Sequence, residues 1–242
     1  MSALLRVEGA GKSFRGLKAV QNASFDVPQG AIVGLIGPNG AGKTTMFNLI
    51  AGVYAPDAGS IAFDGKPIGG LRPDQVCRAG IGRTFQIVKP FAGLSVLDNV
   101  IVGALARSPS VADARKVANA TLEKLGLAPK RDLPASSLTL PDRKRLEVAR
   151  ALATRPRLLL LDEVMAGLRP TECDQMVQVF QELNRAEGLT ILLIEHVMRA
   201  VMALARHIVV LHHGEIIARG APQDVVRDPA VLECYLGEEA EV

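Results

Sequence analysis

Alternating polar and apolar residues near the N-terminus predict strands of an antiparallel sheet. The alternation covers residues 5–8 and again residues 23–27, and a period of two turns one apolar face toward a core. An Asp-Gly dipeptide at 64–65 follows the apolar stretch 61–63, and this dipeptide favours a hairpin turn. The first part of the chain is therefore expected to form a small antiparallel β subdomain.

Continuous apolar runs further along predict strands that are buried on both faces. The runs cover residues 31–36, 158–161 and 190–194, lengths that suit strands. Helical periodicity lies between the last two, over residues 173–183, and a Thr-x-x-Asp pattern at 171–174 resembles a capping box. Buried strands that alternate with amphipathic helices indicate a parallel α/β core.

A stretch richer in helix lies between about residues 95 and 154. It carries two apolar stripes at helical spacing, formed by Ala114, Val117, Ala118, Leu122 and Leu125 and by Leu146, Ala149, Leu152 and Ala153. We therefore predict one domain over residues 1–242. About residues 1–86 and 156–242 form the core with its antiparallel β part, and about 87–155 form an inserted helical subdomain.

The composition is that of a globular protein with little charge bias. The 242 residues include 28 Lys and Arg against 25 Asp and Glu, for a net charge of +3, an excess too small to indicate nucleic acid as a partner. The three cysteines show no metal-ligand spacing and suit a reducing compartment. The sequence shows no signal peptide and no run of roughly 18 uncharged apolar residues, so we expect a soluble or peripheral chain.

A glycine-rich segment after the first buried strand fits the phosphate-loop pattern G-x-x-x-x-G-K-[ST]. Its residues are Gly37, Pro38, Asn39, Gly40, Ala41, Gly42, Lys43, Thr44 and Thr45. The glycines let backbone N–H groups turn toward phosphate oxygens, and the helix that follows adds a partial positive charge at its N-terminus. Lys43 is predicted to reach the β- and γ-phosphates of a bound nucleotide, and Thr44 to ligate Mg²⁺.

Two carboxylates end the buried strand at 158–161. Asp162 and Glu163 would face the ligand crevice, because ligands bind at the carboxyl ends of parallel strands. Asp162 is a candidate Mg²⁺ ligand, directly or through water. Glu163 points elsewhere, since it is one residue further on, and is a candidate to orient or deprotonate a water.

The order of these residues along the chain resembles that of the ATP-binding subunit of ABC transporters. The phosphate loop is followed by Gln86, a signature region, the paired carboxylates and finally His196. The resemblance covers nearly the whole chain and implies the P-loop NTPase fold with the two subdomains described above. It also implies that Phe14 stacks on adenine, with Val20 on an adjacent apolar wall.

The same resemblance implies roles around the γ-phosphate. Gln86 would ligate Mg²⁺ and the attacking water while sensing a membrane partner, Glu163 would be the catalytic base, and His196 would contact the γ-phosphate.

The implied partners are integral-membrane permease subunits, a second ATP-binding subunit and, indirectly, an extracytoplasmic substrate-binding protein. The chain would lie peripherally at the cytoplasmic face of the inner membrane. A groove near residues 86–102 is expected to transmit motion to the membrane subunits. Two interpretations of its candidate lining stay open, a groove wall or ordinary core of the helical subdomain, and the residues concerned are Val88, Phe91, Leu94, Val96 and Leu97.

Five short segments are also similar to those of the branch of this family that takes up branched-chain or other hydrophobic amino acids. The segments in question are 83–86, 145–150, 166–168, 193–196 and 235–237. ATPases of lipopolysaccharide export and urea uptake share some of these segments and stay open as alternatives. So do a weakly catalytic regulatory module and a soluble ABC-type ATPase of repair or translation.

The sequence departs from the family where it would face a partner's nucleotide. The usual L-S-G-G-Q is replaced by residues 138–142, in which Thr139 keeps the hydroxyl, Pro141 has no N–H to donate, and Asp142 adds negative charge near an anion. The basic run 143–145 either compensates Asp142 or forms a solvated face, the interpretation we favour. Arg169 also stands where most of the family has Asp. These changes suggest pairing with a different ATPase subunit, with self-pairing left open.

Overall fold

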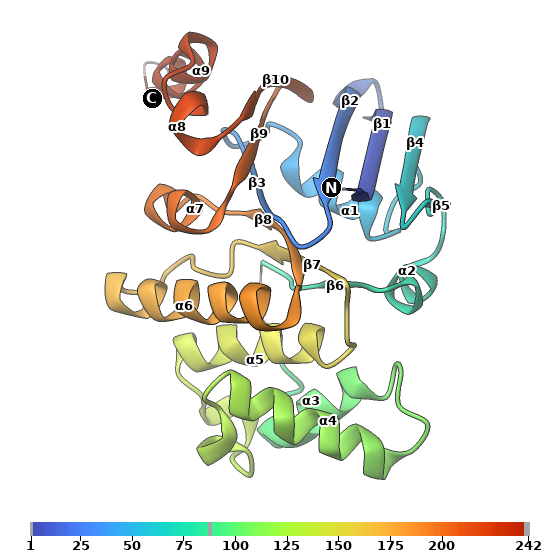
Figure 1. The fold of residues 1–242 in the computed structure, drawn as a ribbon, viewed down its shortest axis with the longest axis vertical. Helices are drawn as coiled ribbons and strands as arrows, with labels where there is room; N and C mark the ends of the chain where they lie inside the picture. Colours follow the sequence, from blue (N-terminus) through green and yellow to red (C-terminus); the bar gives the residue numbers. More distant parts are fainter. Residues whose placement is uncertain (1, 87–88, 240–242) are drawn as a thin grey trace.

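The computed structural model describes residues 2–86 and 89–239, and the strands within them form two sheets (Figure 1). One sheet is antiparallel, in the order β2–β1–β4–β5, and consists of β1 (Ala3–Phe14), β2 (Leu17–Pro28), β4 (Ala58–Phe63) and β5 (Lys66–Pro67). The other has the order β10–β9–β3–β8–β7–β6 and consists of β3 (Ile32–Ile36), β6 (Ile81–Arg83), β7 (Leu158–Asp162), β8 (Thr190–Ile194), β9 (His207–His212) and β10 (Glu215–Gly220). Its pairs are parallel except for β9–β10. The predicted fold class is confirmed.

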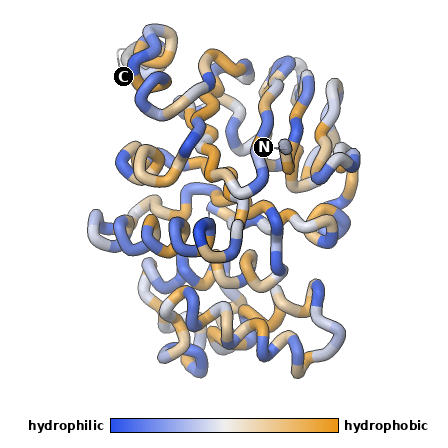
Figure 2. The backbone as a smooth tube through the Cα atoms, viewed as in Figure 1, coloured by the Kyte–Doolittle hydropathy of each residue, from blue (hydrophilic) through white to orange (hydrophobic). Residues whose placement is uncertain are grey.

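The central strands are buried on both faces, as their continuous apolar runs predict. Every residue of β3, β7 and β8 is buried. In β7 the period of two divides the side chains between two cores: Leu158 and Leu160 face the antiparallel sheet, and Leu159 and Leu161 face the helices. In Figure 2, hydrophobic colours run along the middle strands and hydrophilic ones mark outer helical turns.

Helices cover the large sheet and fill the space between the sheets. These are α1 (Lys43–Ile50), α2 (Pro73–Ala79), α6 (Pro170–Glu187), α7 (Met198–Leu204), α8 (Pro222–Val225) and α9 (Pro229–Glu239). The apolar face predicted for residues 173–183 is the buried face of α6. The capping box predicted at 171–174 is wrong by two residues, because Pro170 takes the first helical position, and the Arg169 N–H donates to Glu172 Oε2 at 2.8 Å.

A helical layer lies below the sheets in Figure 1. It consists of α3 (Val96–Ala104), α4 (Val111–Lys124), the short 3₁₀ turns η1 (Ala128–Lys130) and η2 (Ala135–Ser137), and α5 (Leu140–Leu152). Its apolar stripes belong to the same hydrophobic cluster as α6 and one face of the large sheet. In the described residues, no helix combines the length and apolar character that a membrane span requires.

Candidate nucleotide-binding and hydrolysis site

The phosphate loop joins β3 to α1, and its glycines are required by close backbone contacts. A Cβ at Gly37 would lie 1.9 Å from the Leu211 carbonyl oxygen, and one at Gly42 would lie 2.3 Å from that of Ala19. Both residues have positive φ, 147° and 103°, which side chains other than hydrogen tolerate poorly. Gly42 is the N-cap of α1, so the N–H groups of the first turn are presented to an anion.

Lys43 is folded back over the loop that precedes it. Its Nζ donates to the carbonyl oxygens of Gly37 and Pro38, both at 2.6 Å, and the side chain is buried. The ammonium is thereby held at the centre of the loop, where the predicted contacts with phosphate oxygens would be made.

A cavity of about 640 Å³ opens over the loop. It is lined by Phe14, Leu17, Lys18, Ala19, Gln21, Asn39, Gly40, Ala41, Gly42, Lys43, Thr44, Thr45, Gln86, Glu163 and His213. The structure therefore brings most of the predicted site residues to one space. Phe14 is partly exposed at its rim, edge-on to Tyr54 with ring centroids 5.1 Å apart. Val20 is buried in the core, and the wall beside Phe14 is formed by Leu17 and Ala19 instead.

Glu163, Gln86 and His196 converge, although they follow three different strands. Gln86 Nε2 donates to Glu163 Oε2 at 2.6 Å, and His196 Nε2 lies 2.9 Å from Glu163 Oε1. The His196 contact requires the proton on Nε2, because an ionised carboxylate only accepts. Glu163 has a φ of 50°, an uncommon backbone conformation for a side-chain-bearing residue. In this structure His196 orients the carboxylate, and both Glu163 and Gln86 face the cavity.

Asp162 has one carboxylate oxygen in an ion pair and one left over. Its Oδ2 accepts from Arg83 at 3.1 Å, while the buried Oδ1 has no hydrogen-bond partner within the described residues. Burial raises the pKa of Asp162 and outweighs the lowering effect of Arg83. An orphaned carboxylate oxygen fits Mg²⁺, which prefers oxygen ligands and keeps contacts with substrate phosphates. Asp162 itself is buried and does not line the cavity, whereas Thr44 does. The described chain holds no cluster of three or more His, Cys, Asp or Glu suited to a metal, so the phosphates would complete the shell.

Two buried ionisable residues beside Glu163 escaped the sequence analysis. Glu195 is 3% exposed and accepts from the Met165 N–H at 2.9 Å, and burial raises its pKa to about 7. Lys144 is 5% exposed and donates to the carbonyl oxygen of Glu163 at 3.0 Å. The solvated-face interpretation of 143–145 is therefore wrong for Lys144. The signal that could have found it is the helical period, since Glu147, Val148 and Ala151 lie three, four and seven residues further along and share the buried face of α5.

The altered signature region turns its charge inward. Asp142 Oδ2 accepts from Lys130 Nζ at 2.5 Å and from the Thr139 hydroxyl at 2.7 Å, and the residue is buried. Burial would raise the pKa of Asp142, but these two hydrogen bonds outweigh it and hold the pKa below its usual range. Lys130 therefore compensates Asp142, and the expectation of an added negative charge facing a partner's phosphates is not supported. Leu140 is exposed and packs against Gly167.

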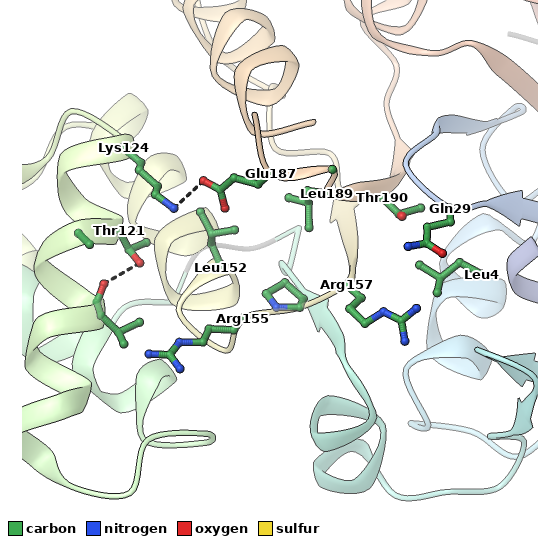
Figure 3. Close-up of a pocket in the computed structure, with 14 residues that line it drawn as sticks. Leu4, Gln29, Thr121, Lys124, Leu152, Arg155, Arg157, Glu187, Leu189 and Thr190 are labelled. Atoms are coloured by element: carbon green, nitrogen blue, oxygen red, sulfur yellow. Dashed lines mark hydrogen bonds and ion pairs between the residues drawn. The ribbon is translucent and has the colours of Figure 1, made fainter. Parts of the chain in front are cut away.

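A second cavity, of about 420 Å³, lies at the amino ends of β7 and β8 (Figure 3). An ion pair between Lys124 of α4 and Glu187 at the end of α6, 2.5 Å long, crosses it. Since the candidate site lies at the carboxyl ends of the same parallel strands, this cavity is at the opposite edge of the sheet. None of the predicted site residues lines it.

Comparison with known proteins decides the family. The model of the ABC transporter family matches residues 20–166. The chain belongs to the ATP-binding subunits of ABC transporters. Residues 215–241 match a second model, described as branched-chain amino acid ATP-binding cassette transporter, and the resemblance to that branch is confirmed. The chain is therefore an ATPase whose hydrolysis of ATP is coupled to transport.

Relatives match over nearly their whole length. The high-affinity branched-chain amino acid transport ATP-binding protein LivG of Salmonella typhimurium is 39% identical, with 97% of this chain and 98% of the relative covered. BraF of Pseudomonas aeruginosa, which has the same description, is 38% identical with the same coverage. The lipopolysaccharide export protein LptB of Acidithiobacillus ferridurans is 35% identical over 100% of both chains. A solved ATP-binding cassette in its ADP conformation matches with a TM-score of 0.89 at 33% identity, covering 98% of this chain and 100% of that one.

Proposed function

We propose that this ABC ATPase powers the uptake of branched-chain or similar hydrophobic amino acids from the cytoplasmic face of the inner membrane. The proposed cargo is supported by the match of residues 215–241 to the branched-chain model, together with the LivG and BraF relatives. Lipopolysaccharide export is the second candidate, because LptB matches at 35% identity over the full length. The C-terminal match favours the amino-acid cargo.

In the proposed reaction, a water attacks the γ-phosphorus of ATP and ADP leaves. Glu163 aligns the water and accepts its proton, since its carboxylate faces the cavity and is held on both oxygens by Gln86 and His196. Lys43 stabilises the charge that builds on the transferring group. Mg²⁺, when bound, would neutralise charge on the β- and γ-phosphates, with Thr44, Asp162 and Gln86 as the residues that would hold it.

We propose that membrane subunits dock on an apolar cavity between α2, α3 and α5. This cavity of about 260 Å³ includes Phe85, 55% exposed, and Val102, 43% exposed. Of the residues predicted to line such a groove, Val96 and Leu97 are buried in the core of the helical layer, whereas Phe91 and Leu94 are exposed. Val88 lies outside the described residues.

The second ATP-binding subunit is proposed to be a different chain. Pro141 still removes one N–H from the signature turn, and the exposed Leu140 adds bulk there. The inward-facing Asp142 removes one objection to self-pairing, so the pairing is to be measured directly. The chain is purified alone and titrated over concentration. Full cooperative hydrolysis by the lone chain would contradict the need for a distinct partner.

The cargo is tested by reconstitution. The chain is co-expressed with candidate permease subunits and a candidate binding protein, and ATP-dependent uptake of labelled leucine, isoleucine and valine into vesicles is measured. We expect leucine, isoleucine or valine uptake that is lost without the chain. Assembly without uptake of these amino acids, together with ATP-dependent extraction of lipopolysaccharide, would favour the export function instead.

A further inference from the structure

Helix α5 joins the two ends of the proposed mechanism within one chain. Its first turn, Leu140–Asp142, is the region that would meet the other subunit's nucleotide. Further along, the same helix packs toward β6 and β7, the strands that lead to Gln86 and Glu163. A displacement of the first turn can therefore be transmitted along a rigid element to the residues that act on the chain's own nucleotide.

Three polar side chains of α5 hold the segment that carries Gln86. Lys144 Nζ donates to the Gln86 carbonyl oxygen at 3.4 Å, and the buried carboxylate of Glu147 accepts a backbone hydrogen bond from Phe85. Arg150 donates to the Lys89 carbonyl oxygen at 3.2 Å and to Glu147 at 2.9 Å. The spacing of three residues places these side chains on one face of the helix.

Lys144 is the member of this set that also reaches the catalytic strand. Its 3.0 Å hydrogen bond to the Glu163 carbonyl oxygen fixes the backbone of the residue whose side chain faces the cavity. Burial lowers the pKa of Lys144, while the carboxylates of Glu195, Glu163, Asp162 and Glu147 act in the opposite direction. A buried ammonium is costly to leave without acceptors, so its position is tightly tied to these carbonyl oxygens.

We propose that Lys144 is a positioning residue that couples the signature turn to Glu163 and Gln86 of the same chain. The inference rests on the proposed roles of those two residues. Engagement of the signature turn by the other subunit would then shift Glu163 and Gln86 through α5, so that occupancy of one composite site changes turnover at the other. Lys144 itself does not line the nucleotide cavity.

The test compares variants of Lys144 with a variant of Lys124, a second lysine that links the helical layer to the core. Lys124→Met removes the ion pair with Glu187 at the opposite edge of the sheet (Figure 3). We expect Lys144→Met to lower kcat for ATP about tenfold or more while KM changes less than about twofold, and to lower the Hill coefficient of the assembled pair. Lys144→Arg, which keeps the charge and the donors, should restore most of kcat. Lys124→Met should stay near the wild-type value.

A second measurement does not depend on turnover. Hydrogen exchange of the Phe85, Gln86 and Glu163 amides should be faster in Lys144→Met than in Lys124→Met. If Lys144→Met does not fold, Lys144→Gln takes its place, because it removes the charge and shortens the reach. Unchanged kcat and unchanged exchange in the folded variant would overturn the inference. Faster exchange at these amides, with Glu163→Gln still turning over ATP at the wild-type rate, would instead refute the proposed base and leave the coupling standing.

Discussion

At the scale of single residues, the carboxylate of Glu163 is the centre of the site. One carboxylate oxygen accepts from the side-chain amide of Gln86, which follows β6, and the other contacts the imidazole of His196, which follows β8. The backbone carbonyl oxygen of Glu163 accepts from Lys144 of α5. Pre-positioned groups of this kind lower the reorganisation needed when charge develops in the transition state. The rate of hydrolysis should therefore depend on this one carboxylate far more strongly than nucleotide binding does.

Glu163→Gln is expected to bind ATP with near-wild-type affinity and to lose turnover by about two to four orders of magnitude, because the amide cannot accept the proton of the attacking water. Phosphate release and binding of a fluorescent ATP analogue measure the two quantities. Glu187→Gln is the matched control, since it makes the same chemical change at the remote ion pair with Lys124. Near-normal hydrolysis by Glu163→Gln would show that the base lies elsewhere.

Glu195 predicts a pH dependence of stability. Its pKa is raised from 4.5 to about 7 in the folded protein, so the folded state binds this proton more tightly than the unfolded state. The stability that this provides is full below about pH 4.5 and is lost as pH rises through about 7. Relative to wild type, Glu195→Gln should gain about 2–3 kcal/mol in free energy of unfolding between pH 5 and pH 8.

Urea unfolding of both proteins across this pH range measures the difference. The constant cost of placing an amide at Glu195 cancels, because only the slope with pH is compared. Glu215→Gln, at an exposed residue of β10, serves as control. Parallel curves for wild type and Glu195→Gln would mean that Glu195 is ionised throughout.

At the scale of elements, the conformation of the phosphate loop is stabilised by contacts with β2, with the end of β9 and with the turn between β9 and β10. The β9–β10 turn donates from Gly214 N–H to the Ala41 carbonyl oxygen at 3.0 Å, and Gln21 of β2 donates to the Gly214 carbonyl oxygen at 2.7 Å. Leu211 and Ala19 lie against Gly37 and Gly42. The loop conformation therefore depends on backbone contacts that leave no room for a Cβ.

Gly37→Ala is expected to lower the free energy of unfolding by about 3 kcal/mol or more and to abolish ATP binding, because the new Cβ would clash with the Leu211 carbonyl oxygen. Gly16→Ala is the control: its φ is also positive, 91°, but a Cβ there has no described atom within 4 Å. This change should cost only about 1 kcal/mol. Urea unfolding and ATP-analogue binding are measured for both, and equal losses would argue against the steric explanation.

At the scale of the whole molecule, the cavity over the phosphate loop and the apolar cavity between α2, α3 and α5 are lined by two neighbouring residues of the chain. Phe85 lines the apolar cavity and Gln86 the nucleotide cavity. Phe85 and Gln86 therefore give a short physical connection between the proposed docking cavity and the proposed hydrolysis site. The segment is held by α5, so the helical layer participates in this connection.

Val102→Asp should leave ATP binding by the isolated chain unchanged and abolish co-purification with the permease subunits, because it places a charge at a dry apolar contact. Val111→Asp is the matched control, since Val111 is exposed on α4 and does not line the cavity. Affinity co-purification and vesicle uptake are the measurements. Normal assembly of Val102→Asp would place the docking surface elsewhere.

The sequence by itself determined the features whose physics is local. The glycines of residues 37–42, the apolar runs of β3, β7 and β8, and the carboxylates that end β7 follow from backbone sterics and hydrophobic period. The parallel core follows from them, because strands buried on both faces require helices on either side. These local rules also placed Asp162, Glu163 and His196 at one edge of the sheet.

Only the tertiary structure decided which charged residues turn inward. Lys144 stands in a basic run that looks solvated, yet it is buried because α5 packs onto the segment after β6 and the turn after β7. Asp142 faces Lys130 of η1, and Val20 faces the core. Such partners are distant in sequence or depend on how helices pack, and burial of a charge depends on those partners. Helical periodicity places Lys144 on the buried side of α5, but the carbonyl oxygens that accept from its ammonium are known only from the tertiary structure.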